Sequence, residues 1–212
     1  MNQEPASTAK RPKIPDDILE VLKQMETGLA VGASGISTRF PARLDELSVN
    51  SIPEAIDQIL GPHHPRLAEL LHWLAVLYHS RGDLAKAEFL YRRALDIAER
   101  TTKFSSESGL IMNNLGRAMQ EQKKFEEAEV LYRRSLAILQ QTLGVEHPRL
   151  ATPLSNAASL SWEKGNRVEA ELLYRHSLAI LEDMFGPLHP KVIKARKKLD
   201  SCKATVRPAT EL

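Results

Sequence analysis

The sequence AEVLYRRSLAI at positions 128–138 decides the fold, because it occurs twice more in nearly the same form. AEFLYRRALDI stands at 87–97, which is 128 − 87 = 41 residues earlier, and AELLYRHSLAI stands at 170–180, which is 170 − 128 = 42 residues later. Similarity at a fixed offset of this size is the signature of a repeat architecture. In each copy a small Ala precedes a Tyr by four residues, so both lie on one face of a helix and predict close packing against a second helix.

The linkers recur with the same period. Gly144 and Gly186 each open a Gly-x-x-His-Pro sequence, 186 − 144 = 42 residues apart, and Gly61 opens a third copy, 144 − 61 = 83 residues before Gly144. Proline suits the first turn of a helix, where its missing N–H is no loss. We therefore expect a first helix to begin after each His-Pro, with the histidine capping it. This helix should end at Gly82 or Gly165, which can adopt the left-handed conformation of a helix cap.

Each unit is predicted to hold two antiparallel helices, the second starting near Asp83, Lys124 or Asn166. Neither helix can bury its apolar stripe alone, so the units must stack into a solenoid. The pattern Leu-Gly (or Ala), Gly-Asp and Ala-Glu-x-x-Tyr-x-x-Ala-Leu resembles the tetratricopeptide repeat. The long period and the Leu-Gly-x-x-His-Pro linker resemble the kinesin-light-chain variant of that repeat. The resemblance covers roughly Gly61 to Asp200 and implies an all-α, right-handed α-solenoid of three repeats.

The predicted organisation has seven segments: a disordered N-terminus at 1–13, an N-terminal helical region at 14–60, repeats at 61–102, 103–143 and 144–185, a C-terminal capping helix at 186–202 and a tail at 203–212. The region 14–60 is either a cap or a degenerate repeat, and we favour the cap. In the capping helix, Val192, Ala195 and Leu199 are expected to cover the last apolar surface. The basic residues of this helix are expected to face water, as terminal repeats need a polar outer face: Lys191, Lys194, Arg196, Lys197 and Lys198.

Composition and charge exclude several classes of protein. Of the 212 residues, 42% are apolar and 26% charged, as in ordinary soluble proteins, and the net charge of +2 is too small to demand a nucleic-acid or membrane partner. Cys202 is the single cysteine, so no disulfide forms within the chain. The N-terminal sequence does not resemble a secretory signal, and no apolar run is long enough to span a membrane. We expect a soluble, cytoplasmic protein.

Residues that could carry chemistry do not combine into a catalytic or metal site. The seven histidines include no His-x-x-x-His pair, and no cysteine cluster accompanies them. Gly32 to Gly35 lacks the lysine of a phosphate-binding loop. Arginines on the second helices each follow a glutamate by four residues, which predicts ion pairs rather than a phosphate track. These pairs are Glu88 with Arg92, Glu129 with Arg133, and Glu171 with Arg175. The sequence thus predicts no enzyme, no cofactor and no metal.

The family resemblance implies that the first helix of each repeat lines a concave groove for a peptide. Counting from the Leu-Gly position, the candidates are His72, His79, Asn113, Asn114, Arg117, Gln120, Ser155, Asn156, Ser159 and Trp162. Asparagine can hold a peptide amide through both donor and acceptor, and arginine can select a carboxylate. Trp162 is either a binding hot spot or a packing residue between repeats, and the other polar residues are either binding groups or merely solvated. The clamp of chaperone-binding relatives needs bases at the positions of His72, Ser155 and Ser159, and only the mostly neutral His72 is present, so a chaperone C-terminus is not an expected ligand.

The function predicted from these features is a protein–protein interaction adaptor that binds a linear or helical segment of a partner. The alternative is a self-assembling scaffold, a homo-oligomer formed through the solenoid ends or the N-terminal helices. A third idea is electrostatic docking of the Lys191 to Lys198 helix on nucleic acid or anionic lipid. This helix is short and lacks interleaved aromatic residues, so a solvated cap is favoured.

Overall fold

The computed structural model describes residues 65–101 and 105–204, and within them it contains α-helices and one 3₁₀ turn but no strand. The elements are α3 (Pro65–Ser80), α4 (Leu84–Thr101), α5 (Ser106–Glu121), α6 (Phe125–Leu143), η2 (Pro148–Leu150), α7 (Ala151–Glu163), α8 (Arg167–Phe185) and α9 (Pro190–Ala204). The expected segments 1–13 and 14–60 and most of the tail lie outside the described residues.

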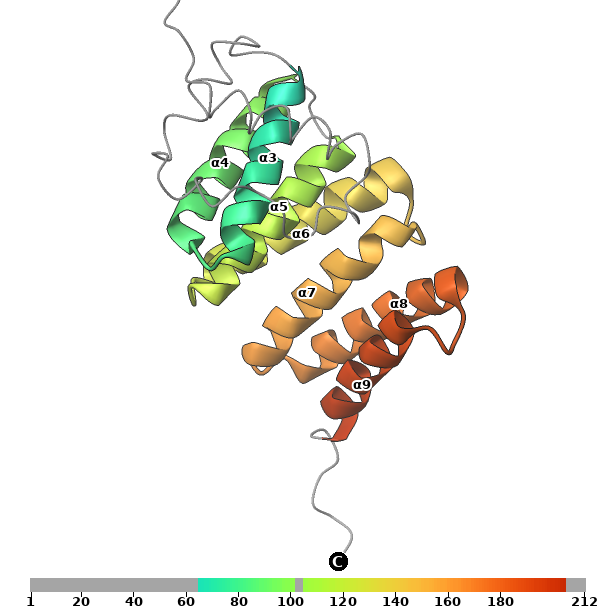
Figure 1. Ribbon diagram of the computed structural model, residues 1–212. Helices are drawn as coiled ribbons and strands as arrows, with labels where there is room; N and C mark the ends of the chain where they lie inside the picture. The colour runs from blue at the N-terminus through green and yellow to red at the C-terminus, as the bar shows by residue number, and fades with distance from the viewer. Residues whose placement is uncertain (1–64, 102–104, 205–212) are drawn as a thin grey trace, which may run out of the picture. The chain divides into compact units, whose positions relative to one another are not determined.

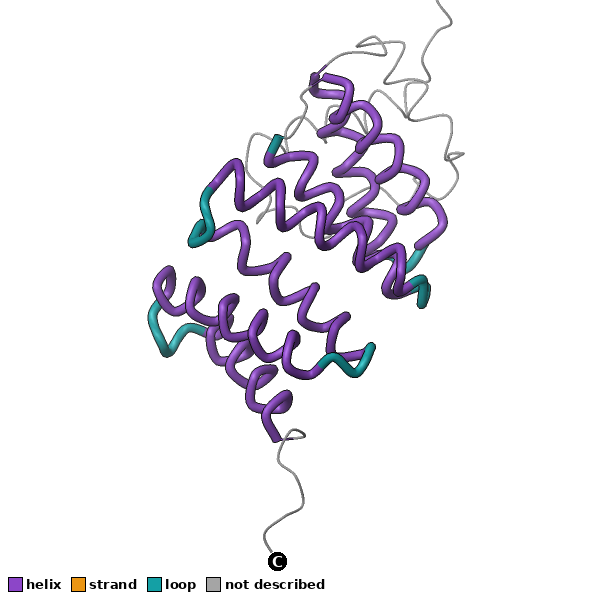
Figure 2. The backbone as a smooth tube through the Cα atoms, turned by 180° about the vertical axis from the view of Figure 1, so that it is seen from behind, coloured by secondary structure: helices purple, strands orange, loops and turns teal. Residues whose placement is uncertain are grey.

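The helices pack as successive antiparallel pairs (Figures 1 and 2). Within the pairs, α3 contacts α4, α5 contacts α6, and α7 contacts α8. Between pairs, α4 packs on α5, α6 on α7 and α8 on α9, while the first helices α3, α5 and α7 also touch in order. The predicted all-α stack of helix pairs is confirmed for the described residues, and the right-handed sense of the superhelix stays a prediction.

The first helix of each repeat ends in the same way. Gly82 and Gly165 have φ of 82° and 84°, as the sequence predicts, and Lys123 adopts the same left-handed conformation with φ of 64°. After each of these residues the next backbone N–H returns to the helix, as Asn166 N does to Ser161 O over 2.8 Å. This arrangement satisfies carbonyl groups that the helix end would otherwise leave unpaired. Lys123 accepts a conformation for which glycine is better suited.

The linkers also act as the sequence predicts. The Nδ1 atom of His147 accepts a hydrogen bond from Arg149 N over 3.1 Å, and His189 Nδ1 accepts one from Lys191 N over 3.2 Å. Each histidine therefore caps the turn that follows its proline. The second repeat has lost this linker, and there Ser105 caps α5 by accepting from Ser108 N over 3.2 Å.

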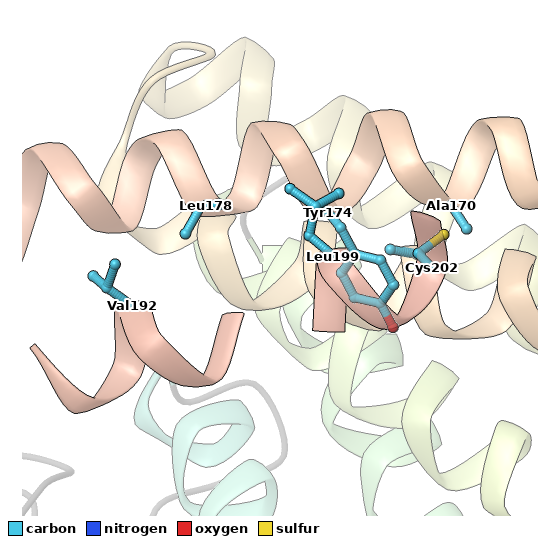
Figure 3. Packing of buried hydrophobic residues seen from close by; sticks show 7 residues of the cluster. Ala170, Tyr174, Leu178, Val192, Leu199 and Cys202 are labelled. Atoms are coloured by element: carbon cyan, nitrogen blue, oxygen red, sulfur yellow. The ribbon is translucent and has the colours of Figure 1, made fainter. Parts of the chain in front are cut away.

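The core lies between the helices, and α9 closes it at the C-terminal end. The repeated alanines and tyrosines are buried, with exposed fractions of 7% or less. Figure 3 shows Tyr174 and Leu178 of α8 packed with Val192, Leu199 and Cys202 of α9. Val192 and Leu199 are buried, which confirms that α9 covers the last apolar surface. The burial of Cys202 raises the pKa of its thiol, so this cysteine is not an activated nucleophile.

The predicted ion pairs form on the second helices. Arg92 pairs with Glu88 over 3.0 Å, and Arg133 and Arg175 pair with Glu129 and Glu171. Further pairs join neighbouring repeats, such as Arg92 with Glu127 over 2.9 Å. Exposed pairs of this kind contribute little stability, but they neutralise the basic stripe on these helices.

Candidate functional site

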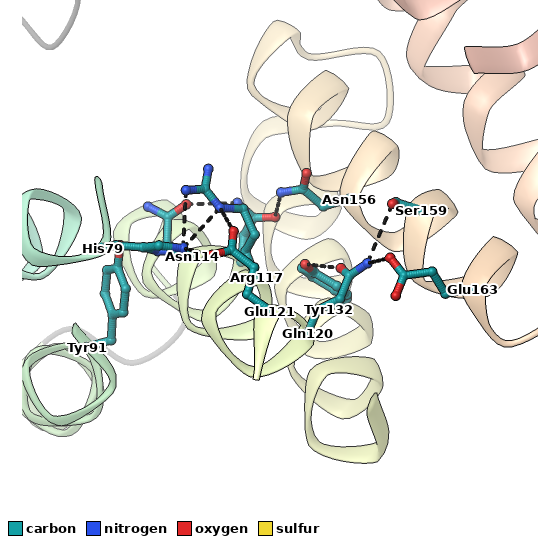
Figure 4. A network of polar contacts seen from close by, with 11 residues as sticks. His79, Tyr91, Asn114, Arg117, Gln120, Glu121, Tyr132, Asn156, Ser159 and Glu163 are labelled. Atoms are coloured by element: carbon teal, nitrogen blue, oxygen red, sulfur yellow. Dashed lines mark hydrogen bonds and ion pairs between the residues drawn. The ribbon is translucent and has the colours of Figure 1, made fainter. Parts of the chain in front are cut away.

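Four polar side chains form a chain of hydrogen bonds across the first helices of the three repeats. Nδ2 of Asn114 lies 2.8 Å from His72 Nε2, joining α5 to α3. Asn113 Nδ2 donates to Asn114 Oδ1 over 3.1 Å, and Asn156 Nδ2 of α7 donates to Asn113 Oδ1 over 3.0 Å. We call these residues, His72, Asn114, Asn113 and Asn156, the amide ladder. Figure 4 shows Asn114 and Asn156 of this ladder beside Arg117 and Gln120 of α5.

The members of the amide ladder differ in exposure. Asn113 is only 3% exposed, and both ends of its side-chain amide are used within the protein. Asn114 and Asn156 are half-buried and keep unused hydrogen-bonding capacity, since each amide can donate twice and accept twice. Asn113 is therefore suited to orienting its two neighbours, while Asn114 and Asn156 are suited to contacting a ligand.

Glu107 anchors the α3 end of the ladder. Its Oε1 lies 2.8 Å from His72 Nδ1, and this hydrogen bond is the main cause that lowers the pKa of the Glu107 carboxyl, against the opposing effect of burial. With its proton on Nδ1, the His72 ring donates to Glu107 and accepts from Asn114 at Nε2. One tautomer thus satisfies both neighbours.

A second cluster surrounds His79 near the C-terminal end of α3. Arg117 Nη2 lies 3.2 Å from His79 Nε2, and Arg117 Nε pairs with Glu121 over 3.2 Å. Tyr91 OH lies 3.4 Å from Nδ1 of the same imidazole. Burial, followed by the charge of Arg117, lowers the pKa of His79. Glu121, whose Oε2 lies 3.0 Å from His79 Nε2, acts to raise this pKa but does not outweigh the two other causes. The imidazole is neutral at pH 7 and accepts from Arg117, whose own side chain is about half exposed.

Gln120 connects three helices. Its Oε1 accepts from Tyr132 OH of α6 over 2.9 Å, and its Nε2 donates to Glu163 of α7 over 2.7 Å and to Ser159 over 3.5 Å. Gln120 is buried, so its amide fixes the position of α7 on α5. Ser159 is half-buried beside it.

Trp162 and Ser155 have neighbours from the C-terminal helices. Trp162 is half-buried against the α8–α9 core, and the Arg167 guanidinium lies 4.4 Å from the centroid of its ring. Ser155 accepts a hydrogen bond from Lys198 Nζ over 3.0 Å. The sequence places Lys198 in water, and this expectation is wrong: the side chain is half-buried and turned toward α7. Trp162 contributes to the packing of α7 against this core, and a role for its exposed part in binding stays a prediction.

The side chains described above give α3, α5 and α7 a surface rich in hydrogen-bond donors and acceptors. No group of three His, Cys, Asp or Glu side chains in 65–101 and 105–204 is placed to hold a metal ion. Within the same ranges no helix is both long and apolar enough to cross a membrane. Sequence reasoning missed Glu107 and Lys198 as parts of this surface, because their spacing within their own helices carries no signal of the contacts they make with others.

Comparison with known proteins identifies the repeat. A family model described as tetratricopeptide repeat matches residues 54–100 and 107–183. A clustered mitochondria protein homolog from Coccidioides immitis (strain RS) is 28% identical over 155 residues, and one from Aspergillus niger is 27% identical over 162 residues. Each match takes 68% of this chain and 12% of the relative, so the chain spans a small part of these proteins.

Two solved structures share the fold. BtubC (BKLC) from P. vanneervenii superimposes with a TM-score of 0.57 and 21% identity, covering 90% of this chain and 87% of that chain. A kinesin light chain of Podosopora anserina with nearly identical TPR-like repeats gives a TM-score of 0.50 and 22% identity, covering 79% of this chain and 88% of that chain. The family model matches more than half of the chain and the structures agree with it, so this chain belongs to the tetratricopeptide repeat family.

Proposed function

We propose that the chain is a non-catalytic adaptor that binds an extended or helical segment of another protein along α3, α5 and α7. Tetratricopeptide repeats are generally protein-interaction scaffolds. The observation that carries the proposal here is the amide ladder, which crosses all three first helices and holds Asn114 and Asn156 in fixed orientations.

An oriented amide suits a peptide backbone. The side chains of Asn114 and Asn156 can each donate to a peptide carbonyl and accept from a peptide N–H. Because hydrogen bonds within the protein already restrict their rotamers, little side-chain entropy is lost when a partner binds. Contacts of this kind hold a backbone without reading its side chains, so the ladder supplies affinity more than specificity.

Arg117 adds a charged contact. Its guanidinium has five N–H donors, and those on Nη1 have no partner among the described residues. Glu121 and His79 hold the group in place from one side. A carboxylate of the partner can then approach from the other side and form charge-assisted hydrogen bonds.

The test compares two triple variants in affinity capture from a lysate of the source organism. The first, Asn114→Ala, Arg117→Ala and Asn156→Ala, removes the exposed ends of the site but leaves the buried Asn113 intact. The control, Arg133→Ala, Gln141→Ala and Arg175→Ala, changes exposed residues of the second helices. We expect a protein retained by the wild type and the control to be lost by the first variant, with unchanged helicity by circular dichroism. Equal retention by both variants would contradict the proposal.

Self-assembly through the solenoid end is the alternative, and α9 disfavours it. Along 190–204 the apolar residues Val192 and Leu199 are buried, and Ile193 is the one large apolar side chain that is exposed, at 41%. The surface of α9 is therefore mostly polar and lacks the apolar patch that self-association would need. Light scattering over a hundredfold range of concentration should give a constant mass, whereas a mass that rises with concentration would favour the scaffold.

A further inference from the structure

A pocket of about 300 Å³ lies between α7 and α9, at the C-terminal end of the candidate binding surface. Lys191, Lys194 and Lys198 of α9 line one side, and Ser155 and Asn156 of α7 line the other. Leu181, Met184 and Phe185 of α8 contribute an apolar part of the lining. The pocket is continuous with the amide ladder, because Asn156 belongs to both.

The three lysines of the pocket lie together without an acidic partner among the described residues. No carboxylate of residues 65–101 or 105–204 forms an ion pair with Lys191, Lys194 or Lys198. Many other basic side chains in the same ranges are paired with Asp or Glu, including Arg92, Arg100, Lys124, Arg133, Arg134, Lys164, Arg175 and Arg196, whereas the exposed Lys197 and Lys203 of α9 do not line the pocket. Two of the three lysines lie near aromatic rings instead: the Lys191 amine is 5.1 Å from the Phe185 centroid and the Lys198 amine 5.7 Å from that of Tyr174. The pocket therefore carries positive charge that the described residues do not neutralise.

Lys198 is held in an unfavourable position for a cation. It donates to Ser155 Oγ over 3.0 Å across the pocket, and its side chain is half-buried. Burial is the main cause that lowers the pKa of its amine, and the neighbouring charge of Lys194 lowers it further. An anion between the two amines would relieve both effects, because it replaces lost solvation and screens the repulsion.

We infer that this pocket receives a carboxylate side chain of the partner segment that lies along the amide ladder. The inference rests on the proposed function, since Asn156 would hold the backbone next to the bound carboxylate. Protein is favoured over nucleic acid because the three lysines gather at one pocket and do not continue as a basic stripe along the second helices. The basic stripe of the second helices is neutralised, and the net charge of the chain is only +2.

The experiment selects peptides from a phage library of random dodecamers on the immobilised full-length chain. The test variant, Lys194→Gln with Lys198→Gln, removes two charges from the pocket. The matched control, Lys197→Gln with Lys203→Gln, removes two charges from exposed positions of the same helix that do not line the pocket. We expect the wild type and the control to enrich peptides with Asp or Glu at one recurring position, and the test variant to lose that acidic preference.

One selected peptide is then synthesised with Glu, Gln or phosphoserine at the recurring position, and its Kd is measured by fluorescence anisotropy. Glu→Gln should weaken binding to the wild type by on the order of tenfold, as for loss of a charge-assisted hydrogen bond, and should have no effect on the test variant. Acidic preference that survives in the test variant, or no acidic preference in the wild type, would overturn the inference. Binding of the phosphoserine peptide more than about tenfold tighter than the Glu peptide would also overturn it, by reassigning the pocket to phosphate.

The variant Asn114→Ala with Arg117→Ala leaves Asn156 and the rest of the pocket intact, and it separates this inference from the proposed function. If that variant still enriches the same acidic peptides while the pocket variant does not, the pocket is supported and the ladder is refuted. A library that yields no enriched peptide with the wild type would overturn both.

Discussion

The side chain of Asn156 donates a hydrogen bond from Nδ2 to Oδ1 of Asn113 over 3.0 Å, which joins the first helix of the third repeat to the first helix of the second. Asn113 in turn donates to Asn114 over 3.1 Å. One buried amide therefore orients two half-exposed amides, one on its own helix and one on the next. We therefore expect Asn113 to affect both the stability of the protein and the proposed binding, although this residue is too deep to contact a partner.

Replacing Asn113 should lower the stability of the protein and weaken partner binding. Asn113→Ala removes two hydrogen bonds at a buried site and should lower the free energy of unfolding by about 1–2 kcal/mol in a urea titration. It should also weaken partner binding, because Asn114 and Asn156 lose the group that orients them. The exposed replacement Gln141→Ala serves as the control and should change neither quantity. An unaltered unfolding midpoint for Asn113→Ala would show that the buried hydrogen bonds contribute no net stability.

The left-handed residue Lys123 offers a way to stabilise the protein. Lys123→Gly should raise the free energy of unfolding by about 0.5 kcal/mol, because relief of the left-handed backbone strain exceeds the extra entropy of glycine in the unfolded chain. The ion pair lost with Glu163 is long, at 3.9 Å, and exposed, so it contributes little. Lys123→Ala keeps the left-handed backbone and measures the combined loss of that ion pair and of the contact between the Lys123 amine and the Phe125 ring, 5.6 Å from its centroid.

The reverse change at the equivalent position gives an independent check. Gly165 has φ of 84°, and an added Cβ would meet no atom within 4 Å. Gly165→Ala should therefore cost about 1 kcal/mol through backbone conformation alone. Stability equal to wild type would show that the cap at this turn does not require the left-handed conformation.

His79 should make stability depend on pH. Its pKa is lowered in the folded state from the ordinary value of 6.5, so the unfolded chain binds more protons between the two values. The stability contributed by the neutral imidazole is complete above pH 6.5 and is lost as the pH falls below 6.5 toward the folded pKa. Urea titrations from pH 7.5 to 5 should show this loss in the wild type and a flatter profile in His79→Gln. Identical profiles would exclude His79 as the cause.

Tyr132 and Tyr91 should respond differently to loss of the hydroxyl group. Tyr132 OH donates to the buried Gln120 over 2.9 Å, whereas Tyr91 OH lies 3.4 Å from His79 Nδ1. Tyr132→Phe should cost about 1 kcal/mol in thermal or urea unfolding, and Tyr91→Phe should cost less because the longer contact is weaker. The opposite order would mean that the Gln120 bridge is not the stronger link.

The features that could be predicted from the sequence are local in the chain. The Ala and Tyr of each repeat lie one turn apart, so their shared face and burial follow from helix geometry. The Glu88–Arg92 pair and the capping by His147 depend on residues four and two positions apart. Even the unusual end of α5 at Lys123 falls where the alignment places Gly82 and Gly165. Regular spacing carries this information because each interaction closes within one turn or one linker.

The candidate site depended on contacts that the spacing does not encode. Asn113 and Asn114 are neighbours on one helix, and counting along the repeat assigns both to the groove. Only the packing of α7 on α5 decides that Asn113 is buried and bonded to Asn156, 43 residues away. Lys198 is likewise one of several lysines on a polar helix until α9 docks and brings its amine to Ser155, 43 residues earlier.

The sequence by itself therefore determined the repeat, the helix pairs and the ion pairs within the second helices, because these follow from periodicity and from interactions over a few residues. Only the tertiary structure decided which polar side chains are used internally, which remain half-exposed beside the amide ladder, and where unpaired positive charge collects. Those outcomes depend on the distance and rotation between helices of different repeats, and the packing of the whole core sets both.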